Sequence, residues 1–187
     1  MLYRLLIDKD FDGIVRIDLP EENSILVEAH IHFLYTGTLP TNAEEQGNTP
    51  ATTREEIELL SRLHRFAYVT EHADFYNATL DGIIEISRVK DPETGLHCLP
   101  DPAKISHFPW HSEAKRCFID LYAHFMDPED PVIDRPENQQ FMREVLKASI
   151  RMSKVRSEHG DLRVHELKNC DYHRHEKGVR CDGGNEK

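Results

Sequence analysis

The chain has 187 residues, of which 30% are charged and 39% hydrophobic, and its formal net charge is -11. No apolar run approaches the roughly 20 residues that span a membrane, which argues against a transmembrane helix. The cysteines are too few for a disulfide framework in a chain this long. We therefore expect an intracellular globular protein, in the nucleus or the cytoplasm.

The charge is unevenly distributed. Residues 1–142 carry 12 Lys and Arg against 26 Asp and Glu, a net of -14, whereas residues 143–187 carry 11 against 8, a net of +3. Broad contact with phosphate backbones needs a basic surface, so the acidic body argues against nucleic-acid binding. The basic end leaves room for an acidic partner.

The first elements are a strand and a helix. Residues 13–19 alternate apolar and polar side chains, which predicts one short, half-buried strand. A helix is expected over 23–36, and Gly37 stands just past its end, where a left-handed residue is favoured. The face expected to pack inward consists of Val27, Ile31, Phe33 and Leu34.

The middle of the chain alternates polar stretches with helical patterns. Residues 38–52 predict a surface loop, and residues 53–56 have the pattern of a capping box that starts the next helix. A further helix is expected over 72–87, and residues 89–112 hold four prolines. The residues expected to face inward on these two helices are Ile57, Leu60, Leu63, Ala67, Phe75, Ala78, Ile83 and Ile86.

Two more helices are expected, over 113–126 and around 141–155. The second has an apolar stripe of Phe141, Val145, Ala148, Met152 and Val155, with Arg143, Lys147, Arg151 and Lys154 roughly opposite. A basic amphipathic helix can bind membranes or calmodulin-like partners. We favour the simpler interpretation, in which the apolar stripe packs on the body and the basic face is solvated.

Several segments together resemble a known family. A strand ending in Ile17-Asp-Leu-Pro-Glu-Glu-Asn-Ser24, then a helix ending in Ile31-His-Phe-Leu-Tyr-Thr-Gly37, resembles the later part of a BTB/POZ domain. Residues 59–84 are similar to its next two helices. Residues 114–125 resemble the helix after the domain in fungal BTB proteins, and residues 170–181 match their frequent Cys-x-Tyr-His-x-His…Cys ending.

The resemblance implies a mainly α (α+β) fold with one short strand. It divides the chain into a partial BTB/POZ-like domain (1–88), a Pro-rich linker (89–112), a C-terminal helical extension (113–157) and a polar tail with a Cys/His cluster (158–187). A complete BTB domain opens with a strand pair and a helix that this sequence does not supply, so the domain would be N-terminally truncated. Family members dimerise largely through those elements, which makes homodimerisation doubtful.

The resemblance also implies a function. It predicts a non-catalytic protein–protein interaction module, such as a substrate adaptor for a cullin-type ubiquitin ligase or a transcriptional scaffold. The expected partner is a cullin or another BTB protein. The exposed parts of the 23–36 helix and the 38–52 loop would form the contact surface.

The tail holds the candidate metal ligands Cys170, His173, His175 and Cys181. Two thiolates and two imidazoles suit tetrahedral zinc, and a site filled by four protein ligands is structural rather than catalytic. The alternative is a polar tail that binds no metal, because irregular Cys/His spacings often match by chance. A second functional interpretation follows, of a small zinc-binding protein that binds nucleic acid or serves a metal-dependent activity.

No pattern in the sequence predicts a catalytic site. Residues 8–13 place carboxylates and a glycine as the first half of an EF-hand loop does, but Leu19 stands where the bidentate Glu is needed. Neither a G-x-S-x-G nor an H-E-x-x-H pattern occurs. The unclustered Cys98 and Cys117 are expected to act as small hydrophobic residues.

Overall fold

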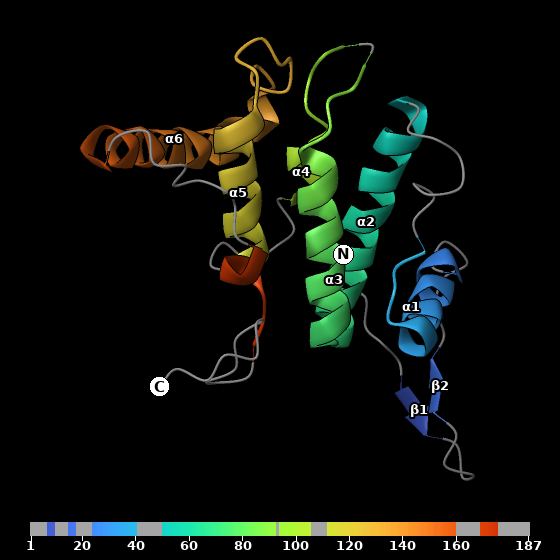
Figure 1. Ribbon diagram of the computed structural model, residues 1–187. Coiled ribbons are helices and arrows are strands. Elements are labelled where there is room, and N and C mark those ends of the chain that lie inside the picture. The colour runs from blue at the N-terminus through green and yellow to red at the C-terminus, as the bar shows by residue number, and fades with distance from the viewer. Residues whose placement is uncertain are drawn as a thin grey trace, which may run out of the picture. The chain divides into compact units, whose positions relative to one another are not determined.

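The computed structural model shows a mainly helical chain, which confirms the predicted fold class (Figure 1). The chain divides into two compact units, Met1–Pro40 and Thr41–Lys187. The four-part division expected from the sequence stays a prediction. The structure describes residues 7–9, 15–17, 24–40, 50–92, 94–105, 112–159 and 169–175.

The described residues of the first unit form a two-stranded antiparallel sheet and one helix. Strands β1 (Ile7–Lys9) and β2 (Val15–Ile17) pair with Ile7 opposite Ile17. The sequence predicted one strand over residues 13–19, whereas the structure has two paired strands. The pairing gives the backbone groups of β2 hydrogen-bond partners that an isolated strand would lack. Residues 10–14 lie outside the described part of the chain.

Helix α1 (Ser24–Thr36) ends as predicted, because Gly37 adopts a φ of +71° and its N–H donates to the Phe33 carbonyl at 2.8 Å. Its predicted inward face is wrong. Leu26 and Ala29 are buried, whereas Ile31 and Leu34 are exposed. The helix carries apolar residues nearly all round, so their spacing does not single out one face.

The second unit begins with a helical hairpin of α2 (Pro50–Thr70) and α3 (Ala73–Ser87), which pack side by side in Figure 1. Helix α2 starts at Pro50 rather than after the capping-box pattern, because proline suits the first helical position. All four inward predictions on α2 are confirmed, while Ala78 and Ile86 of α3 are only half-buried. The largest side chains of this core belong to α2 and α3: Leu60, Leu63, Phe75, Tyr76, Leu80, Ile83 and Ile84.

The described part of the Pro-rich segment packs against the helices on both sides. A bridge between Lys90 and His97 closes a tight turn. Arg54 of α2 forms an ion pair with the buried Asp91 at 3.3 Å. The His97 ring lies 4.7 Å from the ring of Phe125, measured between centroids. These contacts tie the turn to both flanking helices.

The chain continues through α4 (Pro102–Ile105), α5 (Glu113–Phe125), the 3-10 turn η2 (Pro136–Asn138) and α6 (Gln139–His159). Helix α6 runs crosswise to α5 (Figure 1). Its stripe is buried at Phe141, Val145 and Ala148, as predicted, and half-buried at Met152, while the Val155 side chain lies outside the description. None of the described helices is long and apolar enough to cross a bilayer.

A histidine lies inside this core. His64 of α2 has no exposed surface, and its ring centroid lies 4.2 Å from that of Tyr76. Its Nδ1 is 3.0 Å from the Thr79 hydroxyl, which itself donates to the Tyr76 carbonyl at 2.9 Å. Thr79 therefore accepts from His64, and we assign the proton of the neutral imidazole to Nδ1.

Replacing His64 should reduce the sensitivity of the fold to acid. Burial lowers the pKa of His64 to about 3, against about 6.5 in an unfolded chain. Below the pKa of the unfolded chain, the unfolded chain binds a proton that the folded chain does not. The free energy of unfolding therefore decreases as the pH decreases. His64→Gln keeps an N–H donor without titrating, and between about pH 7.5 and pH 5 it should lose about 2 kcal/mol less unfolding free energy than wild type. Urea denaturation of wild type and His64→Gln at the two pH values measures the difference. Equal losses of unfolding free energy in the two proteins would contradict the lowered pKa of His64.

Candidate functional site

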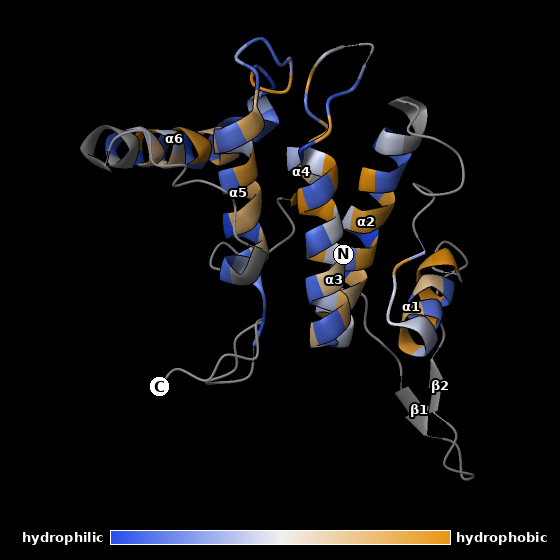
Figure 2. Cartoon of the chain, in the orientation of Figure 1, coloured by the Kyte–Doolittle hydropathy of each residue, from blue (hydrophilic) through white to orange (hydrophobic). Residues whose placement is uncertain are grey.

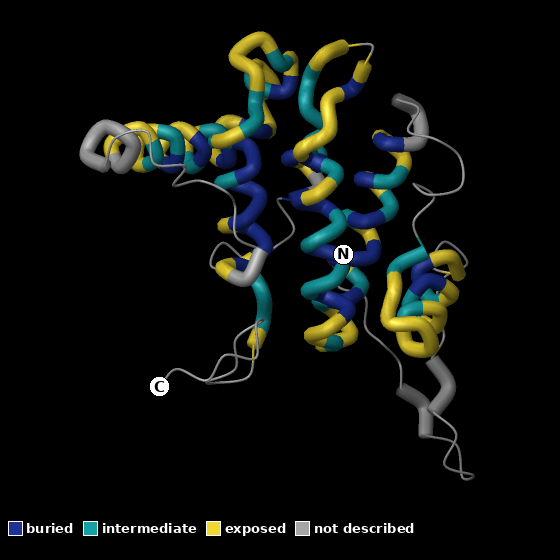
Figure 3. Tube along the Cα trace, in the orientation of Figure 1, coloured by how far each residue is buried: buried dark blue, intermediate teal, exposed yellow. Residues whose placement is uncertain are grey.

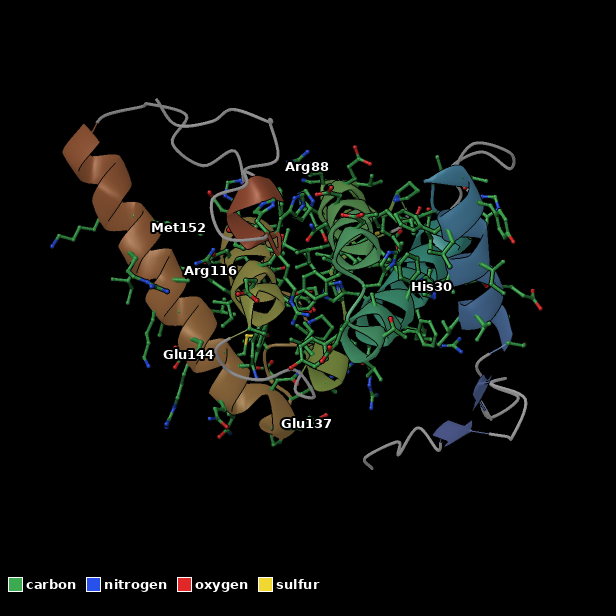
Figure 4. The ribbon with its side chains drawn as sticks, turned by 90° about the horizontal axis from the view of Figure 1, so that it is seen from below. His30, Arg88, Arg116, Glu137, Glu144 and Met152 are labelled. Carbon is green, nitrogen blue, oxygen red and sulfur yellow. The ribbon has the colours of Figure 1, made fainter. Side chains whose placement is uncertain are left out.

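The described end of the chain returns to the helices of the second unit. The tail segment, residues 169–175, consists of the 3-10 turn η3 (Asn169–Tyr172) and three residues without regular secondary structure. It packs against α3 and α5 (Figure 1), and Figure 4 shows Arg116 on α5 beside it. We call the residues that hold it the tail-binding surface: Tyr68, Tyr76, Asn77, Asp81, Glu113, Arg116 and Asp120.

One side chain of α3 holds the backbone of the tail segment. The Asn77 amide donates to the Arg174 carbonyl at 3.0 Å and accepts from the Arg174 N–H at 2.8 Å. These two residues stand 97 positions apart in the sequence. A neighbouring β-strand satisfies an extended residue with the same kind of donor–acceptor pair. Asn77 therefore fixes the position and direction of the tail independently of the tail's side chains.

Tyr172 is the buried anchor of the segment, with 6% of its surface exposed. Its hydroxyl donates to the Asp120 carboxylate at 2.9 Å, and the Arg116 guanidinium lies 5.2 Å from its ring centroid. Arg116 also donates to the Asp171 carbonyl. Burial and the nearby Asp120 carboxylate raise the pKa of Tyr172. The phenol therefore stays protonated and keeps its role as donor.

The next residue faces a carboxylate. His173 Nε2 lies 2.7 Å from Asp81 Oδ1, and 9% of the His173 side chain is exposed against 39% for Asp81. A hydrogen bond this short joins the ring firmly to α3. It also fixes which ring nitrogen faces the helix.

Arg174 completes the contact with its planar group over two aromatic rings. The guanidinium lies 4.2 Å from the ring centroid of Tyr76 and 4.7 Å from that of Tyr68, within cation–π range. Its Nε is 4.0 Å from the Glu113 carboxylate. Each such partly exposed contact contributes about 0.5–1 kcal/mol, and a net hydrogen bond about 0.5–1.5 kcal/mol. Several modest contacts together hold the tail.

The structure describes part of the predicted metal cluster. The rings of His173 and His175 lie 5.7 Å apart between centroids. The Cys170 side chain and all of Cys181 fall outside the description, so the four-ligand set stays a prediction. Within the described ranges, no three His, Cys, Asp or Glu side chains gather as a metal site. His173 does face a carboxylate, as metal-bound histidines usually do.

The two isolated cysteines are not among the residues that define the tail-binding surface, although Cys117 lies near Arg116 and Asp120 on α5. Cys117 is buried on α5, as expected, and burial raises the pKa of its thiol well above the usual value. Cys98 is half-exposed, and burial also raises the pKa of its thiol. Both thiols are therefore protonated at neutral pH and are weak nucleophiles.

Most of the tail-binding surface was not predicted from the sequence. Asn77, Asp81 and Asp120 are polar residues, and the apolar pattern of their helices predicts only which other residues face inward. Nothing local marks them as partners of a segment that follows so far along the chain. The basic composition of residues 143–187 against the acidic body was the one available signal.

Comparisons with protein-family models, with curated proteins and with solved structures give no match to this chain. The BTB/POZ resemblance therefore rests on the residues quoted for it.

Removing the Asn77 amide should release the tail segment. Asn77→Ala loses two hydrogen bonds, or about 1–3 kcal/mol, and should raise the undocked population roughly tenfold or more. Trypsin cleavage after Arg174, whose guanidinium lies over two rings in the docked state, reports that population when docking exchanges rapidly. Mass spectrometry would identify the fragment that ends at Arg174.

A matched control for this experiment lies on the same helix. Glu85 is exposed on α3, so Glu85→Ala should leave the cleavage rate at the wild-type value. If wild type is already cleaved after Arg174 as fast as Asn77→Ala, the tail is not held by this contact.

Proposed function

We propose that the chain is a non-catalytic protein–protein interaction module of BTB/POZ type, whose first unit presents α1 to a protein partner. The observation that carries this proposal is the surface of α1. Ile25, Ile31, Leu34 and Tyr35 are 54%, 47%, 59% and 89% exposed. The same helix is orange over much of its length in Figure 2 and yellow over much of it in Figure 3.

Covering these side chains would be favourable. Moving a large aliphatic or aromatic side chain out of water gains about 1.5–3 kcal/mol, before the cost of association is subtracted. Clustered exposed apolar residues usually mark an interaction site. The helix has Glu28 among its exposed residues, so a partner with apolar and basic groups would suit it.

The resemblance gives this surface a role. Leu34, Tyr35 and Gly37 carry the Leu-Tyr-Thr-Gly ending that resembles a BTB helix terminus. In that interpretation α1 contributes to an adaptor surface, and a cullin or another BTB protein is the expected partner. The weak nucleophilicity of the buried Cys117 and the neutral, packed state of His64 accord with a non-catalytic role.

Two polar substitutions on α1 should separate binding from folding. Leu34→Ser with Tyr35→Ser removes exposed apolar surface, so the stability of the chain should change by less than about 1 kcal/mol for each substitution. Affinity capture of the tagged variant and wild type, followed by mass spectrometry, would show loss of the specific partner. Reconstitution with that purified partner should give at least about a tenfold weaker Kd, or 1.4 kcal/mol.

The matched control is Glu55→Ser with Arg62→Ser, two exposed positions of α2 in the second unit. This variant should retain the partner at the wild-type level. Retention of the partner by the α1 variant as well would remove the proposed role of α1.

A second candidate function is a structural zinc site in the tail. The observation that favours it is the proximity of the His173 and His175 rings, with Asp81 as the carboxylate partner of His173. Zinc bound by both imidazoles and by the thiolates of Cys170 and Cys181 would be a closed site that orders the tail. Under this proposal the metal supplies order rather than catalysis.

Cys170→Ser should then abolish stoichiometric zinc binding. Elemental analysis of purified wild type should find one zinc per chain, lost in the variant and on treatment with a strong chelator. Residues 160–181 should become sensitive to protease under both conditions, because one thiolate ligand is gone. Identical cleavage of wild type, variant and chelated protein would rule out metal-dependent ordering.

A further inference from the structure

The tail segment is held in the way a peptide ligand is held. One donor–acceptor pair from Asn77 holds the backbone of Arg174, and each of the three consecutive side chains from Tyr172 to Arg174 has its own partner on the helices. Recognition of a peptide divides in the same way, with backbone contacts that give affinity and side-chain contacts that give specificity.

The side-chain contacts define a chemical class. At the first position a buried ring must place a hydroxyl on Asp120, which favours tyrosine. At the second position a ring nitrogen lies on the Asp81 carboxylate, which favours histidine. At the third position a planar cation lies over Tyr76 and Tyr68 near a carboxylate, which favours arginine over lysine.

The charges of the two parts are complementary. The surface offers the carboxylates of Asp81, Glu113 and Asp120 beside one guanidinium, that of Arg116, and the segment brings the guanidinium of Arg174. The same opposition holds for the net charges of residues 1–142 and 143–187, at -14 and +3. A basic ligand would therefore be attracted to this face, and the attraction would weaken with added salt.

The tail segment belongs to the same chain as the surface that holds it. Modest contacts are therefore enough to keep the surface occupied. Because the tail segment is tethered, its effective concentration at the surface is roughly millimolar. An untethered ligand must bind more tightly, or be present at a similar concentration, to displace it. The tail is thus a built-in competitor for any ligand of the same chemistry.

From these contacts we propose that α3 and α5, with Tyr68 of α2, form a peptide-recognition site for a Tyr-His-Arg segment of a partner protein, and that the chain's own tail occupies the site in its absence. The site belongs to the second unit and is independent of the role proposed for α1. Its occupant is identified by a tyrosine, a following hydrogen-bonding ring and an arginine two positions after the tyrosine.

The test uses the full-length chain with a disabled tail. Arg174→Ala, alone and with Tyr172→Ala, would be titrated into a fluorescein-labelled peptide of residues 168–178 that carries Cys170→Ser. Fluorescence anisotropy should show saturable binding in the micromolar range. Wild type should bind the same peptide about tenfold or more weakly, because its own tail competes.

The controls separate recognition from general attraction. A peptide with the same residues in scrambled order should bind at least about tenfold more weakly, since it keeps the charge but loses the order of contacts. Adding Asn77→Ala to the disabled-tail chain should reduce peptide binding by a similar factor. Circular dichroism and thermal unfolding of Arg174→Ala, a partly exposed residue, check that the chain still folds.

Three results would overturn the proposal. A folded Arg174→Ala chain without saturable binding would show that the surface only packs the tail. Equal binding of the scrambled peptide would show attraction without recognition. A concentration-dependent wild-type dimer that Arg174→Ala abolishes would show that a second copy, rather than a separate partner, supplies the segment.

Discussion

Tyr76 is the residue on which the second unit depends, because it contacts α2, the start of α5 and the tail segment. Its ring packs against His64 of α2 and has no exposed surface. Its hydroxyl accepts the Ala114 N–H at 3.2 Å, one of the amides that the first turn of α5 leaves without a helical partner. The Arg174 guanidinium lies 4.2 Å from the centroid of the same ring. Burial raises the pKa of Tyr76 to about 12, so the phenol stays neutral in the physiological range.

This arrangement places polar groups at the centre of an apolar hairpin. A buried imidazole and a buried threonine cost free energy unless they are hydrogen-bonded, and a hydrogen bond joins His64 Nδ1 to the Thr79 hydroxyl. Their positions fix the register of α2 on α3, because sliding either helix by one residue would separate the pair. The register in turn sets where Asn77 and Asp81, which follow Tyr76 on α3, present their side chains to the tail.

The sequence predicted the buried face of a helix correctly where the helix has distinct apolar and polar faces. On α2 the residues Ile57, Leu60, Leu63 and Ala67 recur at helical spacing among charged neighbours, and all are buried. On α1 apolar residues lie on nearly all sides of the helix, so spacing could not separate Leu26, which is buried, from Leu34, which is exposed. The tail-binding surface was beyond prediction because the partners of Arg174 lie far earlier in the sequence, Asn77 by 97 positions, and carry no local signature.

The long sequence distance between the tail and its partners also affects how the tail's Cys-x-Tyr-His-x-His pattern is interpreted. Spacing alone directs attention to the residues that could chelate an ion, and it leaves the tyrosine unexplained. In the structure Tyr172 is buried, and His173 faces a carboxylate on α3. A tyrosine and a histidine in this order are therefore accounted for by docking alone. The cysteines are the part of the pattern that docking does not explain, so a metal, if bound, would act on a segment whose position the helices already set.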